Sequence, residues 1–555
     1  MKNMNFNIFI CLLLFSIIVL NSCTKKIDEA YQNPNALTVQ PIESLLPGVI
    51  GNFLGNASSA GSGYGLGGDA TIIGRYIQYW NHFAVTSSDN GGSQYDQMGG
   101  TVGGSDLFGS VWAMFYYGQG QNLNRIIEWG AQQQKWDYVG VAQAIRAWGW
   151  LEMVNQYNSI ILKQAFNTGL QQFNYDDPAE VYDTVRATCY RALTNLNRTD
   201  GAVSRANLAI GDAYMNNGDV NKWKKFVYGV LARSYQYLSN KSAYAANHFA
   251  DSAIYYANLG PLVNSDNITL KFAAQRTSGT SNFFGPFRGN VGGLRQSAYV
   301  ANLLSGLNST AFTGVADPRA WYLIRENSNG TFRGVQPGQG SAGMLTPDLP
   351  KNFWGNPFTS MGAPRAADSG RFVFRDSAQF PVMTASEMQF IVAEAVYRKG
   401  DKATALAAYT NAISLNFDML ANQYAFNVPS FALITPASKA AYLANTNVVP
   451  ANPGNLTLTQ IMLQKYIALY GWGSHETWAD MRRFHYTDID PITGRQVYAD
   501  FVPGGGTLYI NNNGKYVYRA RPRYNSEYLY NVPSLQKIGA LNLDYHTYEC
   551  WFSQQ

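Results

Sequence analysis

Two acidic residues are spaced so that they could act together in catalysis: Glu476 and Asp480, in the stretch SHETWADMRRFHY. On a helix, residues four apart lie on the same face, and hydrolysis of a glycosidic bond uses two carboxyls about 5–10 Å apart. Arg482 and Arg483 follow immediately and can neutralise both acids. Because structural ion pairs also produce such clusters, we expect this pair to be structural.

Other catalytic and cofactor motifs are incomplete in the sequence. His475-Glu476 begins like the zinc motif H-E-x-x-H, but the fifth residue is Ala479. GYGLGG, residues 63–68, fits G-x-G-x-x-G, yet no strand pattern precedes it and no helix clearly opens after it, which argues against a dinucleotide site. The five histidines show no metal-ligand spacing. We therefore predict no catalytic residues, no metal site, no cofactor and no enzymatic activity.

The first residues have the layout of an export signal. Lys2 precedes an apolar run over residues 8–20, and a helix of that length spans about 20 Å, too short for a bilayer core of about 30 Å. This layout is typical of a secretory signal peptide. The tetrad LNSC resembles a bacterial lipobox, although Asn21 departs from its usual small or apolar residue. We predict a signal peptide over 1–22, acylation of Cys23 with palmitate-type chains that anchor it in a membrane, and a tether over 23–45. The alternative is a plain secretion signal with an incidental cysteine.

Composition narrows the class of protein. Charged residues make up 14% of the chain, against about 25% in typical proteins, and the net charge of +5 is too weak and dispersed to indicate nucleic acid binding. Aromatic residues also make up 14%, which suits recognition of uncharged polar ligands, although a large helical core accounts for most of them. Cys189 lies on an apolar helix stripe and is predicted to be buried. Its spacing from Cys550 leaves open whether the two form a disulfide.

Helices in pairs are the main structural signal. Residues 384–418 contain a T-x-x-E capping box at Thr384 and Glu387, an apolar stripe, and a break at Gly400 before a second helix capped by Asp401. Small alanines where these helices cross resemble a tetratricopeptide unit. Similar patterns occur at 138–157, 177–196 (with Asp177 as N-cap), 222–238 and 241–260. The sequence therefore predicts a mainly α fold, with tetratricopeptide-like helix pairs forming a scaffold, long irregular loops and minor β content.

Long Gly-, Asn- and Ser-rich insertions separate the pairs, at roughly 55–70, 86–106, 275–296, 326–370 and 499–516. Loops this long are uncommon in compact domains and tend to be functional or disordered. Several carry aromatic residues. A rigid helical scaffold with aromatic loops suggests a binding protein.

Ordered segments along nearly the whole chain resemble the SusD/RagB nutrient-binding outer-membrane lipoproteins of Bacteroidota. These segments are the lipobox, NPN at 33–35, AIRAWGWLEMVNQY, KWKKFVYGVLARSYQYLSN, ADPRAWY, the 387–413 helix pair, LQKYIALYGWGSHETWADMRRFHY and RPRYNSEYLYN. Two departures affect loop shape: NSIIL at 158–162 stands where many relatives have Gly-Asp-x-Pro, and Asn525 replaces a proline.

The resemblance implies one SusD-like domain over 46–555 and a protein on the cell's outer membrane, lipid-anchored and facing the exterior. It implies binding of a nutrient, most commonly an oligosaccharide, and delivery to a SusC-type TonB-dependent transporter for which the protein is the lid. A peptide-binding member of the same family is one alternative. A surface-anchored glycoside hydrolase and a purely structural tetratricopeptide adaptor are weaker ones. Nucleic acid is not an expected partner.

Candidate ligand-binding residues were sought among aromatic side chains on loops, because rings on helix stripes are occupied by packing. This selects Tyr79, Trp80, Tyr95, Phe283, Phe284, Phe287, Arg288 and Trp354. For Tyr79 and Trp80 a place in the core is an equal alternative, since GRYIQYWNHF has a helix-like pattern. Trp354, flanked by Asn352 and Asn356, is the best single candidate, and its replacement by alanine is expected to weaken binding with little change in stability.

Overall fold

A computed structural model of the chain describes residues 40–55, 64–84, 94–99, 108–273, 280–309, 311–355, 369–506 and 508–555, without the side chains of residues 94, 95, 505 and 506. The predicted signal peptide, Cys23 and the tether as far as residue 39 lie outside these ranges. Folded structure is present from Ile42, whose side chain is buried just before the predicted domain boundary at 46.

Helices account for most of the regular structure. The α-helices are α2 (Ile42–Gly51), α3 (Leu66–Tyr76), α4 (Gln94–Gln97), α5 (Ser110–Ala113), α6 (Gly120–Gln132), α7 (Trp136–Tyr157), α8 (Pro178–Leu196), α9 (Arg205–Gly211), α10 (Val220–Gln236), α11 (Ala243–Ala246), α12 (Phe249–Ala257), α13 (Ala298–Ser305), α14 (Ala320–Leu323), α15 (Ala385–Arg398), α16 (Lys402–Gln423), α17 (Pro436–Leu443), α18 (Leu458–Ala468), α19 (Ser474–Arg483) and α20 (Val532–Lys537). Two segments are π-helical, η1 (Met114–Gln119) and η8 (Tyr524–Tyr528). Single 3₁₀ turns are η2 (Asn264–Asp266), η3 (Thr346–Asp348), η4 (Ser430–Ala432), η5 (Pro453–Asn455), η6 (Pro503–Gly506), η7 (Ile510–Asn512) and η9 (Tyr545–Thr547).

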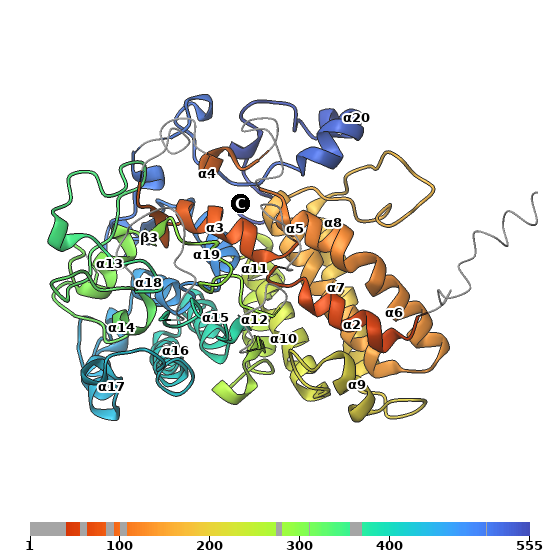
Figure 1. Cartoon of the computed structure of the whole chain (residues 1–555), viewed down its shortest axis with the longest axis horizontal. Helices are drawn as coiled ribbons and strands as arrows, with labels where there is room; N and C mark the ends of the chain where they lie inside the picture. The colour runs from red at the N-terminus through yellow and green to blue at the C-terminus, as the bar shows by residue number, and fades with distance from the viewer. Residues whose placement is uncertain are drawn as a thin grey trace, which may run out of the picture.

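The helices pack as a continuous array. Neighbours along it are α6 on α7, α7 on α8, α8 on α10, α10 on α12, α12 on α15 and α15 on both α16 and α18. In Figure 1 the array runs from α6 on the right to α16 on the left, with loops and the C-terminal segment above it. The predicted mainly α scaffold of helix pairs is confirmed. None of the helices within the described ranges is both long and apolar enough to span a membrane.

The α15–α16 pair confirms the tetratricopeptide-like pattern and corrects one detail of it. Gly400 adopts φ +89° between the helices, and the Asp401 carboxylate accepts a hydrogen bond from the Thr404 backbone N–H at 3.0 Å. Thr384 caps α15 by accepting from the Glu387 N–H at 3.2 Å. The Glu387 carboxylate does not complete the expected capping box, because it binds Arg233 instead. An ion pair between helices thus replaces a local cap.

The described part of the glycine-rich run, residues 64–68, packs closely against neighbouring segments. Contrary to the sequence expectation, a helix does open here, since α3 begins at Leu66. A Cβ at Gly67 would lie 2.6 Å from the Leu54 carbonyl, and one at Gly68 would lie 2.3 Å from the Ser110 hydroxyl. Residues 56–63, just before this helix, lie outside the described ranges. Gly67 and Gly68 are explained by packing, since neither position has room for a side chain.

Strands in the described ranges form three antiparallel two-stranded pairs. They are β1 (Trp80–His82) with β3 (Leu294–Gln296), β2 (Ile268–Leu270) with β4 (Phe380–Met383), and β5 (Ile489–Asp490) with β6 (Arg495–Gln496). This is the predicted minor β content. The thiols of Cys189 and Cys550 are both free and buried, and burial raises the pKa of Cys189.

An imidazole fixes the C-terminal tail to the end of α19. His485 Nδ1 lies 2.8 Å from Asp488, and Nε2 lies 2.9 Å from Glu549 near the chain end. The hydrogen bond to Asp488, then the one to Glu549, raises the pKa of His485 to about 10. The imidazole is therefore charged and doubly paired at neutral pH.

We expect His485→Gln to lower the free energy of unfolding by about 1–3 kcal/mol near pH 6, because hydrogen bonds between charged groups contribute about that much. The folded pKa is raised above the usual 6.5. The stabilisation is therefore complete below about pH 6.5 and is lost as pH rises through about 10. Urea unfolding at pH 6, 8 and 10 measures this. His248→Gln is the control, because that imidazole is 81% exposed. A wild-type advantage that does not shrink between pH 6 and 10 would contradict this reading.

Candidate functional site

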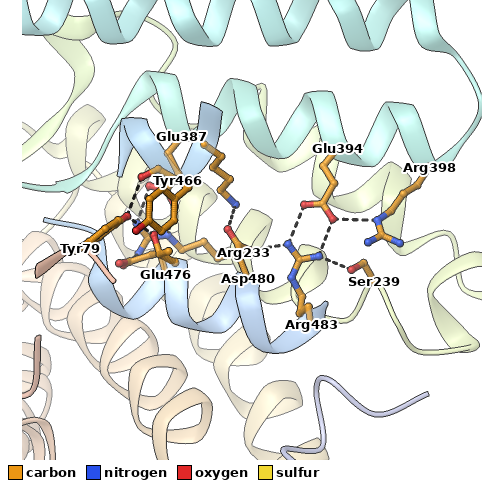
Figure 2. A network of polar contacts seen from close by, with 12 residues as sticks. Tyr79, Arg233, Ser239, Glu387, Glu394, Arg398, Tyr466, Glu476, Asp480 and Arg483 are labelled. Carbon is orange, nitrogen blue, oxygen red and sulfur yellow. Dashed lines mark hydrogen bonds and ion pairs between the residues drawn. The ribbon is translucent and has the colours of Figure 1, made fainter. Parts of the chain in front are cut away.

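The acids Glu476 and Asp480 lie in a buried ion network on α19 and not in an open site (Figure 2). Asp480 pairs with Arg483 at 2.6 Å and with Lys465 on α18 at 2.7 Å. Glu476 pairs with Arg233 on α10 at 2.9 Å. The expected charge pairing is confirmed, but Glu476 takes its partner from another helix. A polysaccharide cannot reach carboxyls that are only 6% and 1% exposed.

Three carboxyls surround the Arg233 guanidinium. Glu387 accepts from it at 2.6 and 2.8 Å, Glu476 lies 2.9 Å away and Glu152 lies 3.8 Å away. Burial raises the pKa of Glu476 to about 7, against the opposing effect of Arg233. A raised pKa is also a property of catalytic acids. For Glu476, burial and the nearby carboxyl of Glu387 explain the raised pKa. Arg482, expected to neutralise the acids, instead donates to the carbonyls of Asn155 and Tyr518 at 2.5 and 2.8 Å.

Most of the loop aromatics proposed from the sequence are core residues. Trp354 has no exposed surface, and its indole N–H donates to the Phe284 carbonyl at 3.2 Å. Phe284 is likewise fully buried and Phe283 is 9% exposed. The premise that rings on loops are free of packing is therefore wrong for these residues. In this conformation their ring faces cannot stack on a ligand.

Tyr79 and Trp80, for which the sequence left open a ligand contact or a place in the core, are core residues. The Tyr79 hydroxyl lies 2.6 Å from the Thr477 hydroxyl and donates to the Tyr466 carbonyl at 2.9 Å. Trp80 lies in β1 and donates its indole N–H to the Thr71 carbonyl at 3.0 Å. Both side chains have no exposed surface. Tyr79 therefore contacts α18 and α19, and Trp80 ties β1 to α3.

The remaining candidates are Phe287, Arg288 and Tyr95. Phe287 and Arg288 are half-buried, and the Arg288 guanidinium lies 5.7 Å from the centre of the Phe283 ring. The Tyr95 side chain lies outside the described residues. The structure does not bring the sequence candidates together into one open surface.

An open aromatic groove lies elsewhere, between η1, the 161–173 loop and η8. Two adjoining cavities of about 870 and 450 Å³ share Tyr117, Leu170, Phe173 and Glu527 in their walls. We call this combined depression the tyrosine groove. Tyr117 is 48% exposed and Tyr530, at its other edge, is 68% exposed. The exposed amides of Gln171 and Gln172 complete the rim.

Both π-helical segments border the tyrosine groove. Tyr117 lies within η1, and Ser526 and Glu527 lie within η8. A π-helical turn adds a residue to the helical repeat and is frequent at functional sites. In η1 the preceding residues, Met114 and Phe115, stay buried while Tyr117 points outward.

A polar clamp holds the walls of the tyrosine groove together. The Asn531 amide accepts from the Phe173 N–H at 3.1 Å and donates to the Phe173 carbonyl at 2.9 Å. Glu527 accepts from Asn531 and from the Tyr175 hydroxyl, each at 2.7 Å. Burial raises the pKa of Glu527. The loop is thus tied to the C-terminal segment before any ligand arrives.

The sequence contains signals for this site that loop length alone did not reveal. The stretch FNTGLQQFN, residues 166–174, is rich in amides and sits just after NSIIL at 158–162. The tyrosines of RPRYNSEYLYN are the second signal. No local pattern indicates that the two segments meet.

Comparisons with known proteins agree with the fold. A family profile described as "Starch-binding associating with outer membrane" matches residues 34–503. A SusD/RagB family protein from Bacteroides thetaiotaomicron has TM-score 0.67 and 21% identity, covering 93% of this chain and 99% of its own. A SusD homolog from Bacteroides uniformis has TM-score 0.66 and 18% identity, covering 93% and 99%. A chitin-binding SusD homolog from Flavobacterium johnsoniae has TM-score 0.61 and 17% identity, covering 92% and 98%. No curated protein sequence matches at a significant level.

We expect Trp354→Ala to lower the free energy of unfolding by about 3–5 kcal/mol, because it removes a large buried ring and leaves a cavity. This reverses the expectation from the sequence. Tyr530→Ala is the control, since replacement of a ring that is 68% exposed changes stability by about 0.5 kcal/mol or less. Urea unfolding of both variants measures the difference. A Trp354→Ala protein as stable as the wild type would show that the ring is not packed as described.

Proposed function

This chain belongs to the SusD-like family of outer-membrane nutrient-binding proteins, and on that premise we propose that it binds an oligosaccharide in the tyrosine groove. Proteins of this family are binding proteins and not enzymes. The observation that carries the proposal is the pair of exposed rings, Tyr117 and Tyr530, at the edges of one preformed depression.

The groove has the chemistry that sugars need. A pyranose ring presents apolar C–H faces that stack on aromatic side chains, and its hydroxyls take hydrogen bonds from side-chain amides. Tyr117 and Tyr530 supply rings, and Gln171 and Gln172 supply amides. The larger cavity, about 870 Å³, lies within the usual range of about 300–1,000 Å³ for ligand sites. A neutral glucan or chitin-type oligosaccharide is consistent with the family description and with one structural relative.

Anchoring and delivery are also part of the proposal. Acylation of Cys23 would hold the protein on the outer face of the outer membrane, with the tether leading into α2. From there it would act as the lid of a SusC-type TonB-dependent transporter and pass the bound nutrient into the barrel. The family's association with the outer membrane supports this arrangement.

We expect Tyr117→Ala and Tyr530→Ala each to weaken binding of maltoheptaose or chitohexaose about 2- to 10-fold, in line with about 0.5–1.5 kcal/mol for an aromatic stacking contact. Isothermal titration calorimetry measures the affinity. Tyr255→Ala, at a ring that is 60% exposed on α12, is the matched control. Unchanged affinity in the Tyr117/Tyr530 double variant contradicts the site. Binding of apolar peptides with no binding of either sugar supports the peptide-binding alternative.

We expect Cys23→Ala to remove the anchor. The variant should lose incorporation of labelled palmitate, and protein from which residues 1–22 have been removed should move from the membrane fraction to the soluble fraction, because no segment after the signal peptide is apolar enough to retain it. Fractionation after a high-salt wash, with the N-terminus determined, measures this. Retention in membranes of unacylated protein that has lost residues 1–22 would rule out Cys23 as the anchor.

A further inference from the structure

A second aromatic pocket lies on the side of the molecule opposite the tyrosine groove. It is a cavity of about 520 Å³ between α13, α14, η4 and α17, which we call the Trp321 pocket. In Figure 1 α13, α14 and α17 are at the left, whereas α6 and α20, which neighbour the tyrosine groove, are at the right. The two depressions are therefore separate sites.

Three rings give the Trp321 pocket its shape. Phe332 stands 4.9 Å from Trp321 between ring centres, at 78°, and Phe431 stands 5.1 Å from it, at 84°. The rings of Phe332 and Phe431 are thus both nearly perpendicular to the Trp321 ring. Phe431 is 78% exposed, although an isolated phenylalanine would normally be buried. A planar or ring-shaped ligand can contact Trp321 and Phe431 at once.

The charges of the Trp321 pocket favour an anion. Its walls contain one acid, Asp317, and one base, Arg333. Asp317 is already neutralised, since it accepts from Arg319 at 2.6 Å and from the Tyr442 hydroxyl at 2.8 Å. The Arg333 guanidinium makes no hydrogen bond or ion pair with any residue in the described part of the chain. A half-buried cation beside three rings and without a carboxylate partner is a ready anion contact.

Hydrogen-bonding capacity at the rim fits a hydroxylated ligand. The Thr331 hydroxyl accepts from the Asn327 amide at 2.8 Å, which leaves its own proton to donate. Arg333 offers a planar set of donors that matches a carboxylate in two-point geometry.

We propose that the Trp321 pocket is a second saccharide site, selective for a sugar that carries a carboxylate. The sugar ring lies against Trp321 and Phe431, and its carboxylate pairs with Arg333. This inference rests on the proposed function in so far as the ligand is a saccharide. Two sites on one protein raise the avidity for a polymer that presents both neutral and acidic units.

The test uses trigalacturonate and its fully methyl-esterified form, which has the same rings and no charge. Calorimetry on the whole mature chain should show at least 10-fold tighter binding of the acid than of the ester. Arg333→Gln should abolish that preference, and Arg333→Lys should restore much of it. Phe431→Ala should weaken binding of the acid several-fold without unfolding the protein, because the ring is mostly exposed. The preference should also decrease in 0.5 M salt, since the pair is partly open to solvent.

Tyr255→Ala on α12, which lines neither depression, is the control and should leave trigalacturonate binding unchanged. Equal affinity for acid and ester, a preference that survives Arg333→Gln, or no binding of either compound each overturns the second site. Binding of phenylalanine amide at Phe431 with no binding of trigalacturonate also overturns it, in favour of an apolar peptide. None of these results affects the tyrosine groove, which is tested separately with neutral oligosaccharides.

Discussion

Two buried arginines, Arg233 and Arg483, connect the helices on which the rest of the structure depends. Arg233 extends from α10 to Glu387 on α15 and Glu476 on α19, and Arg483 extends from α19 to Glu394 on α15. Removing one partner of a buried pair leaves an uncompensated charge and costs about 3–5 kcal/mol. The network is therefore less a source of net stability than a constraint on how α10, α15 and α19 pack, because each arginine must keep its carboxylate partners on the other helices.

A third buried arginine, Arg482 of α19, connects the helix array to the walls of the tyrosine groove. Arg482, next to Arg483, binds carbonyls of Asn155 on α7 and Tyr518 in the C-terminal segment. That segment continues through η8 to Asn531, which binds Phe173 in the 161–173 loop, while Glu527 of η8 binds Tyr175 just after the loop. The loop itself leaves the end of α7 and returns at Asp176, which pairs with Ile160. Arg482 thus links α7, from which the loop departs, to the C-terminal segment that forms the facing wall of the groove. A preformed site loses less conformational entropy when it binds.

The helix pairs could be predicted from the sequence because their signals are local. Apolar spacing, the cap at Asp177 and the break at Gly400 each act within a few residues, and the structure confirms them. Whether an aromatic ring on a loop becomes buried, in contrast, depends on residues far away in the sequence. Trp354 follows Phe353 in a loop, and nothing nearby in the sequence shows that Phe284 and Phe374 will enclose this segment. The helical scaffold could therefore be predicted from the sequence, but most of the aromatic residues predicted to contact a ligand are buried in the core.

The tyrosine groove could not be predicted for a related reason. Tyr117, Phe173 and Tyr530 come from three segments that are far apart in sequence and meet only through tertiary contacts. An exposed tyrosine in a π-helical turn also has no clear sequence signature, because the turn depends on the packing of the residues before it. Conversely, Glu476 and Asp480, whose spacing in the sequence suggested a catalytic pair, form ion pairs that connect α19 to α10 and α18.

The central claim is that oligosaccharide binds between the 161–173 loop and η8. Amide hydrogen exchange, compared with and without saturating maltoheptaose or chitohexaose, tests this most directly because it reports on both candidate regions at once. The account predicts slower exchange in residues 161–174 and 523–531 on binding, with no change around 283–288 and 352–355. Protection confined to the segments around Phe283 and Trp354 would contradict it and would return the site to the rings first proposed from the sequence.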